Sequence, residues 1–216
     1  TSLAALTDGN DGYLALERPF FSLQDQWSIA VKAGGFARDD PLIEAGKRVD
    51  HLRHTARWAD LEFGRAIRQQ PTGALRLHAA YRLRKEEVGT ERRQFGIVEV
   101  GLSSTEHRFV QRTHVNRFER TEDFNLGSQS LVTAGISTPQ LGGQGPKALF
   151  FSANHQQAIE FSPAQFLIGN VGVTGRSREG SWENALLTIG VRYLQKHALR
   201  HALLGRLEYK QGHRLD

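Results

Sequence analysis

The segment SWENALLTIGVRY, residues 181–193, contains the pattern that decides the fold. Its odd positions from residue 185 onward carry apolar and aromatic side chains: Ala185, Leu187, Ile189, Val191 and Tyr193. Its even positions carry a mixture of small, apolar and charged groups: Leu186, Thr188, Gly190 and Arg192. Side chains of a β-strand point alternately to opposite faces, so this period of two predicts a strand and not a helix. We interpret the segment as one strand of a transmembrane β-barrel.

Nine further segments repeat this layout with varying regularity. They are residues 13–20, 27–33, 57–67, 75–84, 95–104, 128–137, 148–161, 166–174 and 203–210. In the cleanest of them Leu75, Leu77, Ala79, Tyr81 and Leu83 oppose Arg76, His78, Ala80, Arg82 and Arg84. The sequence therefore predicts an all-β fold, an antiparallel transmembrane β-barrel that is partial, with about ten strands in one domain, residues 1–216. Seven polar residues are predicted to face its lumen: Asp60, Glu62, Arg76, His78, Arg82, Arg84 and Arg192.

The connections are predicted from turn residues and from polar runs. Pro19 cannot donate a ladder hydrogen bond, so it should end its strand, and Trp27 should begin the next one at a membrane interface. Residues 1–11, with DGNDG, are expected to form a tight reversal. Residues 34–49 and 85–94 are interpreted mainly as loops, and residues 107–127 as the least strand-like region. Long and short connections tend to alternate, as in outer-membrane barrels.

Composition limits what these strands can belong to. The hydrophobic fraction of the 216 residues is 39%, below the roughly 45–50% of soluble globular chains. No window approaches the ~18 consecutive apolar residues that indicate a membrane helix, whereas a barrel strand needs only about 9–11 alternating residues. The chain contains no cysteine and no methionine, so we expect neither disulfides nor thiolate sites, and we expect a mature chain or a fragment. The net charge of +5 is scattered along the chain, which does not favour nucleic-acid binding.

Three segments carry a resemblance to a known family. Residues 17–27, ERPFFSLQDQW, resemble the strand-turn-strand element RPF-(Y/F)-S-L-x-x-x-W of the BamA/TamA-like outer-membrane proteins, the surface-antigen family of the assembly-factor and two-partner-secretion superfamily. Residues 116–127, NRFERTEDFNLG, resemble the family's ED-x-x-x-G segment, and residues 203–216 resemble the strand before its lumenal loop. The motif positions in this chain are Arg18, Pro19, Phe20, Trp27, Glu122, Asp123 and Gly127.

The resemblance implies a barrel at the bacterial outer membrane that inserts or translocates polypeptides, in contact with lipid and with client polypeptides. It also implies that an incoming strand pairs with an exposed strand edge at a lateral seam. The family's barrel has sixteen strands, whereas this sequence shows neither a POTRA-type domain nor an R-G-(F/Y) motif. It is therefore expected to be the first two-thirds of such a barrel, in which residues 13–20 and 203–210 do not pair. A closed barrel of eight or ten strands is the alternative.

Other functions remain open from the residues themselves. A passive channel with an arginine-rich lumen would prefer anions. A membrane-embedded hydrolase and a soluble lipocalin-like binding barrel are the further alternatives, since alternation alone does not distinguish a lipid-facing strand from a core-facing one.

Candidate chemistry is sparse, so the sequence predicts no enzyme, no cofactor, no metal and no small-molecule substrate. His197 and His201 have a ligand spacing only if they lie on a helix, and His51 and His54 have no carboxylate at a ligand spacing. GLSST, residues 101–105, lacks the nucleophile-elbow pattern. Asp60 and Glu62 share a strand face, where pairing with neighbouring arginines is favoured over acid–base catalysis.

Overall fold

The computed structural model describes residues 2–6, 9–44, 47–113, 121–198 and 201–214. These residues form an 11-stranded antiparallel sheet and a separate two-stranded sheet. The large sheet contains β1 (Ser2–Leu6), β2 (Gly9–Arg18), β3 (Trp27–Glu44), β4 (Lys47–Gln70), β5 (Gly73–Val88), β6 (Glu91–Glu106), β9 (Gln129–Ser137), β10 (Ala148–Ser162), β11 (Gln165–Arg178), β12 (Ser181–Ala198) and β13 (His201–His213). The small sheet contains β7 (Phe109–Thr113) and β8 (Thr121–Asn125). A 3₁₀ turn, η1 (Pro139–Leu141), precedes β10.

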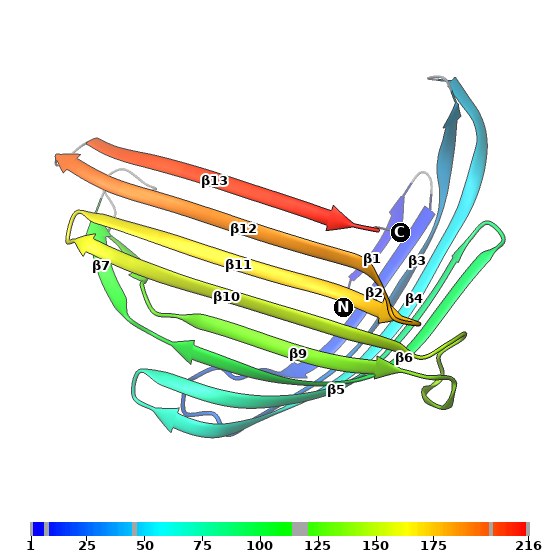
Figure 1. Cartoon of the computed structure of the whole chain (residues 1–216), viewed down its shortest axis with the longest axis horizontal. Helices are drawn as coiled ribbons and strands as arrows, with labels where there is room; N and C mark the ends of the chain where they lie inside the picture. The colour runs from blue at the N-terminus through cyan, green and yellow to red at the C-terminus, as the bar shows by residue number, and fades with distance from the viewer. Residues whose placement is uncertain (1, 7–8, 45–46, 114–120, 199–200, 215–216) are drawn as a thin grey trace.

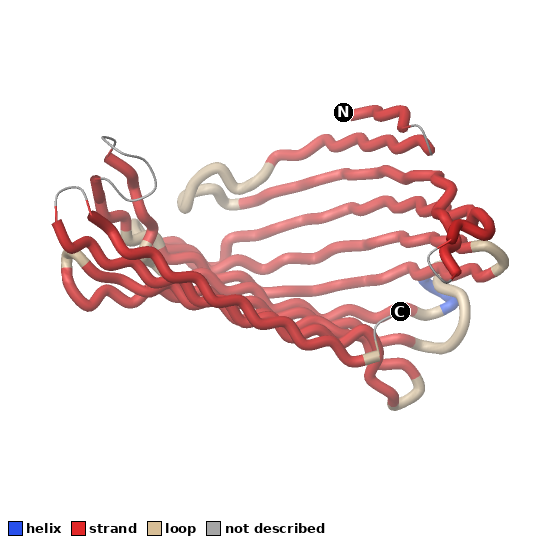
Figure 2. The backbone as a smooth tube through the Cα atoms, turned by 90° about the horizontal axis from the view of Figure 1, so that it is seen from above, coloured by secondary structure: helices blue, strands red, loops and turns tan. Residues whose placement is uncertain are grey.

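The large sheet is a meander that curves into an open trough. Each strand pairs with its neighbour in sequence, except that β6 pairs with β9 across the β7–β8 excursion. Figure 1 shows β9 to β13 as the near wall and β2 to β4 receding behind them. Figure 2, seen from above, shows the two walls converging. Within the described residues β1 and β13 are the two edges, and β2 pairs with β1 and β3 and not with β13, as the sequence predicted.

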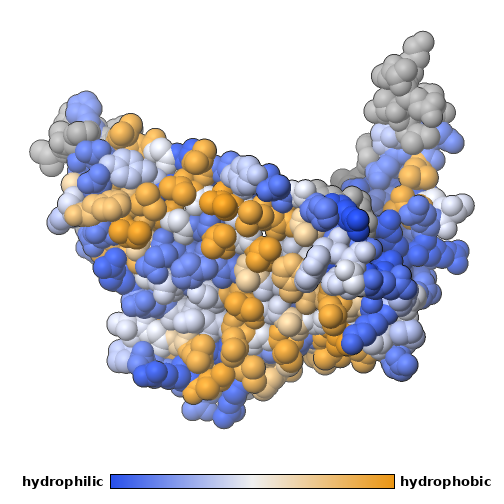
Figure 3. Space-filling model, viewed as in Figure 1, coloured by the Kyte–Doolittle hydropathy of each residue, from blue (hydrophilic) through white to orange (hydrophobic). Residues whose placement is uncertain are grey.

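The register places apolar and polar side chains on opposite faces of the sheet. Leu61 pairs with Tyr81 and Tyr81 with Val98, whereas Asp60 pairs with Arg82. The apolar set lies on the convex face and the polar set on the concave face, because successive residues alternate between faces. Figure 3 shows the convex side of β9 to β13, with a band of apolar side chains across the strands and hydrophilic groups toward the ends. None of the described residues forms a helix long and apolar enough to cross a membrane.

A small apolar core lies inside the trough and not between two layers. Phe124 on β8 and Leu126, which follows β8, pack on the concave face of β10 to β12. Their partners there are Ala158, Phe166 and Leu194, and Phe166 is only 1% exposed. The connection from β6 to β9 therefore folds back into the trough at one end.

Several predicted loops are strands in the structure, so those interpretations were wrong. β3 runs to Glu44 and β4 begins at Lys47, which places most of residues 34–49 in a long hairpin. The charged run 85–94 belongs to β5 and β6, which turn at Gly89 and Thr90. The chain does reverse within residues 1–11, as expected, because β1 pairs with β2 from Leu6 and Gly9 onward, although β2 begins inside the DGNDG run. Residues 107–127, predicted as the least strand-like region, contain the two five-residue strands β7 and β8.

The physical reason for these errors is visible in the β3–β4 extension. Its sequence mixes polar and apolar residues at both parities, so no clear period of two marks it, yet its backbone groups are paired across the hairpin. Cross-strand contacts add to this pairing: the Phe36 and His54 rings meet edge to face at 4.9 Å, and His54 contacts Asp40 at 3.1 Å and Glu86 at 2.7 Å. Polar ladders of this kind stabilise strands without leaving an amphipathic signature.

Candidate functional site: the concave charge ladder

A row of charged side chains crosses the concave face from β2 to β6. At its centre, Arg82 on β5 donates from Nη1 to Glu62 on β4 at 3.0 Å and from Nη2 to Glu99 on β6 at 3.0 Å. Arg82 also approaches Asp60 at 3.4 Å. One guanidinium therefore holds three carboxylates from two flanking strands, and its planar fork of donors suits this role better than the point charge of a lysine.

The ladder continues in both directions. Lys32 on β3 lies 3.3 Å from Glu17 on β2 and 3.7 Å from Glu62. Asp60, only 8% exposed, accepts a hydrogen bond from Arg84 Nη2 at 2.9 Å. We call these seven residues the charge ladder: Glu17, Lys32, Asp60, Glu62, Arg82, Arg84 and Glu99. Asp60 is the buried member of the ladder, and a buried charge that loses its partners costs about 3–5 kcal/mol.

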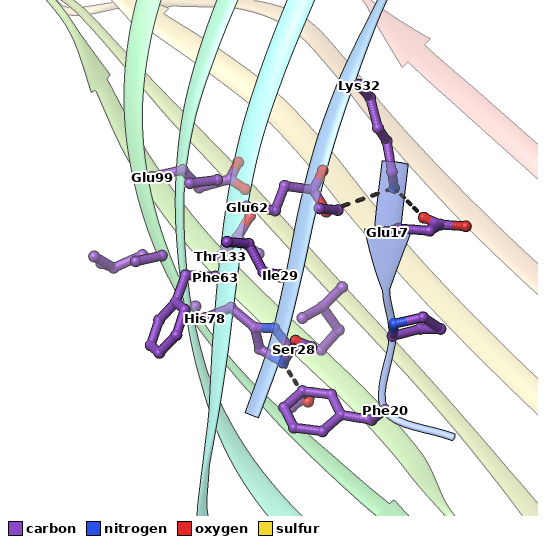
Figure 4. A pocket seen from close by; sticks show the side chains of 18 of the residues that line it. Glu17, Phe20, Ser28, Ile29, Lys32, Glu62, Phe63, His78, Glu99 and Thr133 are labelled. Atoms are coloured by element: carbon purple, nitrogen blue, oxygen red, sulfur yellow. Dashed lines mark hydrogen bonds and ion pairs between the residues drawn. The ribbon is translucent and has the colours of Figure 1, made fainter. Parts of the chain in front are cut away.

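A pocket of about 330 Å³ lies beside the charge ladder on the same face. Figure 4 shows Glu17, Lys32 and Glu62 at its upper rim and Phe20 and His78 below. Its lining includes five small residues, Ser28, Ala30, Ala80, Gly101 and Thr133. In the register Ala30 and Ala80 flank Glu62 on either side, and Gly101 pairs with Thr133. The hollow therefore follows from a cross-strand alternation of large charged and small residues.

The RPF motif forms the lower wall of this pocket. β2 ends at Arg18, directly before Pro19, and Arg18 stacks 3.8 Å from the Trp27 ring centroid while donating to the Trp27 carbonyl at 3.1 Å. The Phe20 ring turns inward, edge to face with His78 at 6.3 Å. A Cβ on Gly64 would meet this ring at 2.7 Å, so the glycine provides the space that Phe20 occupies. The period of two in residues 13–20 predicts that Phe20 shares the apolar face with Leu14 and Leu16. The structure contradicts this prediction, because β2 ends at Arg18 and the chain turns after Pro19.

The β2–β3 connection, residues 19–26, is fixed against the end of the β4–β5 hairpin. Arg76 donates from Nη2 to the Ser22 carbonyl at 2.9 Å and lies 4.2 Å from the Phe20 ring centroid. Gln69 donates to the Leu23 carbonyl at 3.1 Å and to the Asp25 carbonyl at 3.0 Å. The Ser22 amide donates to Asp25 Oδ2 at 2.7 Å, and this hydrogen bond lowers the pKa of Asp25 below its usual value.

The second motif, residues 122–127, lies in the β7–β8 hairpin and directly after it. Glu122 and Asp123 belong to β8 and pair in register with Arg112 and Gln111 of β7. A side chain at Gly127 would clash with the Glu106 carbonyl, so this position requires glycine. Asn125, which the sequence reasoning missed, accepts hydrogen bonds from the Arg108 amide at 3.0 Å and the Gly127 amide at 2.9 Å, and so closes the hairpin.

The residues that were predicted to face a lumen share the concave face but do not form one site. Asp60, Glu62, Arg82 and Arg84 meet in the charge ladder, whereas Arg76 holds the β2–β3 connection. His78 Nε2 lies 2.6 Å from Ser103 Oγ at the bottom of the pocket. Arg192 lies on β12, where it pairs in register with Arg206 of β13.

The histidines with ligand spacing do not assemble a metal site in the described part of the chain, which holds no group of three or more metal-ligating side chains. His54 contacts Asp40 and Glu86, and the sequence missed both because they lie 14 and 32 positions away. The side chain of His197 lies outside the described residues, and His201 opens β13.

The fold and this face define an all-β protein built on an open antiparallel sheet with a polar concave side. Comparisons of the chain with protein-family models, with curated proteins and with solved structures find no match. Its function is therefore argued from its own geometry.

Proposed function

We propose that the chain forms the wall of a bacterial outer-membrane β-barrel, with the convex face toward lipid and the concave face toward a polar lumen. The observation that carries this proposal is the exposure of large apolar side chains along the convex face. Examples are Leu61 at 51%, Val100 at 56% and Leu207 at 69% exposed. Water-exposed apolar patches much larger than a few hundred Å² are rare on soluble monomers, and a lipid environment removes this cost.

The dimensions of the apolar band support the same conclusion. On β5 it runs from Leu75 to Leu83, about 27 Å at ~3.4 Å per residue. The apolar band of outer-membrane barrels is roughly 25 Å tall and its strands are tilted, so the two lengths are comparable. Trp27 and Trp182, which are 40% and 55% exposed, begin β3 and β12 and so lie at opposite ends of the strands. This arrangement fits two interfacial aromatic girdles.

Membrane exposure can be tested by cysteine scanning, because the chain has no cysteine of its own. Single variants Leu77→Cys and Val100→Cys on the convex face are compared with Glu62→Cys and Thr133→Cys on the concave face, after folding into vesicles. The proposal expects the concave pair to react with a charged, membrane-impermeant maleimide and the convex pair to be protected. Equal labelling of all four variants in folded protein would contradict it.

We further propose that this barrel handles polypeptides, in line with its resemblance to insertion and translocation factors. The supporting observation is that β13, a strand of 13 residues, is an edge strand of the large sheet formed by the described residues. An edge strand offers unpaired backbone donors and acceptors to an incoming strand, which is the basis of β-augmentation. On β13 the apolar Leu207 and Tyr209 alternate with Arg206 and Glu208, so a strand of matching alternation would fit.

The test is cross-linking of a peptide strand to this edge. Leu207→Cys should form a disulfide with a cysteine-bearing amphipathic peptide whose apolar and polar residues alternate. Val132→Cys on the central strand β9 serves as the control, because both neighbours of β9 are already paired. Cross-linking that is equal at the two positions, or equal with a scrambled peptide, would refute edge pairing while leaving the membrane wall standing.

The polar trough also suits a passive channel, and the charge ladder decides what selectivity to expect. Arg82 and Arg84, which the sequence had counted as anion-attracting, are held by Asp60, Glu62 and Glu99. Because carboxylates offset these guanidiniums, the ladder favours little selectivity between anions and cations. A strong anion preference in planar bilayers would contradict this balance.

A further inference from the structure

Two arginines oppose each other on the concave face, away from the charge ladder. Arg192 of β12 pairs in register with Arg206 of β13. Directly opposed cross-strand residues have Cβ atoms about 4.5–5.5 Å apart, and like charges at this distance are destabilising. Lys210 adds a third cation two positions beyond Glu208 on the same face of β13. This end of the sheet therefore concentrates positive charge at a place where an anion would relieve repulsion.

A hollow lies between these arginines. It has a volume of about 310 Å³, and the polar side chains that line it are those of Gln156, Asn170, Arg192, Arg206 and Glu208. Gly190 lies at its floor, directly between Asn170 on β11 and Glu208 on β13 in the register. The Asn170 amide lies across Gly190, since a Cβ at residue 190 would clash with it. The glycine thus both opens the hollow and lets the amide reach over it.

The donors at this hollow match one class of ligand. A guanidinium presents parallel N–H groups that suit phosphate and carboxylate oxygens, and two of them can offset a doubly charged group. The amide groups of Asn170 and Gln156 add neutral donors that can complete the coordination of a tetrahedral anion. The geometry points to a binding site for a phosphate-bearing anion between Arg192 and Arg206, with Asn170 and Gln156 as additional donors.

Glu208 reduces the positive charge of this site but does not cancel it. Its carboxylate lies 3.0 Å from Arg206 and 2.8 Å from Lys210. These contacts offset part of the positive charge on β13 and leave a net charge of about +2 from Arg192, Arg206, Lys210 and Glu208 together. Glu208 also binds the Arg206 guanidinium on one side, so its remaining N–H donors can point into the hollow between Arg206 and Arg192.

The site goes beyond the proposed membrane function and does not depend on it. Phosphate could be presented by a soluble molecule or by a lipid headgroup at the rim of the sheet, and both share this chemistry. The experiment uses the full chain folded in detergent, so binding can be measured whether or not the chain inserts into a bilayer.

Binding is measured with two probes at low ionic strength, where such contacts are least screened. Inorganic pyrophosphate is titrated by calorimetry, and mixed micelles containing phosphatidic acid are compared with micelles of phosphatidylcholine alone. The expected result is saturable binding of pyrophosphate, of phosphatidic acid, or of both. Pyrophosphate binding identifies a soluble source as sufficient, whereas binding of phosphatidic acid alone assigns the site to a lipid headgroup.

Variants decide whether this hollow is responsible. Arg192→Gln and Arg206→Gln should each weaken binding by about tenfold or more, because each removes charge-assisted hydrogen bonds. Arg192→Lys should weaken it less, since the charge stays and the fork is lost. Lys85→Gln removes an exposed cation on β5 and should leave the affinity unchanged. Circular dichroism confirms folding of each variant, and Arg192→Lys provides a folded test if a glutamine variant fails. If neither probe shows saturable binding, or if the arginine variants bind as tightly as Lys85→Gln, the assignment is overturned.

Discussion

The two halves of the trough present the same outer face and different inner faces. On β2 to β6 the concave face is charged, and its charges meet in pairs: Arg82 alone contacts Asp60, Glu62 and Glu99. On β10 to β13 the corresponding positions carry amides and glycines, as where Asn154 lies over Gly172 and Asn170 over Gly190. Of the arginines there, Arg176 pairs with Glu183, whereas Arg192 and Arg206 face each other. Both halves are therefore built by the same alternation of apolar and polar residues. Their polar residues differ: the charges on β2 to β6 offset one another, whereas the proposed site between Arg192 and Arg206 attracts an external anion.

The largest expected effect separates the two halves directly. Arg82→Met should destabilise the fold by about 3–5 kcal/mol, because it removes the charge-assisted hydrogen bonds to Glu62 and Glu99, each worth about 1.5–3 kcal/mol. Asp60 keeps its contact with Arg84, and Glu62 keeps its contact with Lys32. Arg192→Met on the other half should change stability by less than about 0.5 kcal/mol, or raise it, because it removes a like-charge contact. Urea unfolding in vesicles measures both values. Equal losses of unfolding free energy in the two variants would mean that the arginines on the two concave faces contribute to stability in the same way.

The next effect tests what the halves share. Leu77→Arg on β5 and Ile189→Arg on β12 both place a charge in the convex apolar band. Each should cost about 2–4 kcal/mol near the midplane of a bilayer. Gln157→Arg is the matched control, because this convex position of β10 is already polar and exposed. If Leu77→Arg were as mild as Gln157→Arg in folded vesicle samples, the convex face would not be lipid-facing on that half.

The β2–β3 connection and the β7–β8 hairpin, which lie over the concave faces of the two halves, are held by different kinds of contact. The β2–β3 connection is held by polar contacts and one ring, whereas the β7–β8 hairpin is held by the apolar cluster around Phe166 and Phe124. Phe20→Ala should cost about 1–2 kcal/mol, from lost stacking with Arg76 and His78. Limited proteolysis should then cut within residues 19–26 while the hairpin stays intact. Unchanged cleavage in Phe20→Ala would show that the ring does not hold this connection.

The strands were predictable wherever one face is apolar. Each of the ten alternating segments coincides with a strand, including β12 from the opening pattern SWENALLTIGVRY, and only Pro19, Phe20 and Ser128 fall outside. Pro19 and Trp27 mark the strand boundaries as expected. The alternation depends only on local sequence, so a single chain suffices to read it. The β3–β4 extension was missed because its stability comes from cross-strand polar contacts that carry no periodic signal.

The site was predictable in part, for the same reason. Parity within a strand placed Asp60, Glu62, Arg82 and Arg84 on one face, but it gave neither their partners nor the register. Lys32 and Glu99 join the ladder only because β3 and β6 flank the other two strands. Phe20 turned inward after Pro19 for a reason that lies 44 positions away, at Gly64. Contacts set by register and by a distant glycine cannot be read from spacing alone.

The smallest effect concerns pH and should appear only at the β2–β3 connection. The Ser22 amide stabilises the charged form of Asp25, so the pKa of Asp25 is lower in the folded protein than in the unfolded chain. A depressed pKa gives a stabilisation that is present above the unfolded value of about 3.9 and is lost as pH falls through the folded value. Trp27 follows Asp25 closely in sequence and, in a Trp58→Phe and Trp182→Phe background, is the single tryptophan of the chain. Its emission should therefore change with a midpoint below about 3.9. Asp25→Asn should remove this transition. The apolar contacts of the β7–β8 hairpin on the other half should not respond to the same change in pH. A midpoint at or above the ordinary aspartate value, or the same transition in Asp25→Asn, would show that this hydrogen bond does not hold the connection.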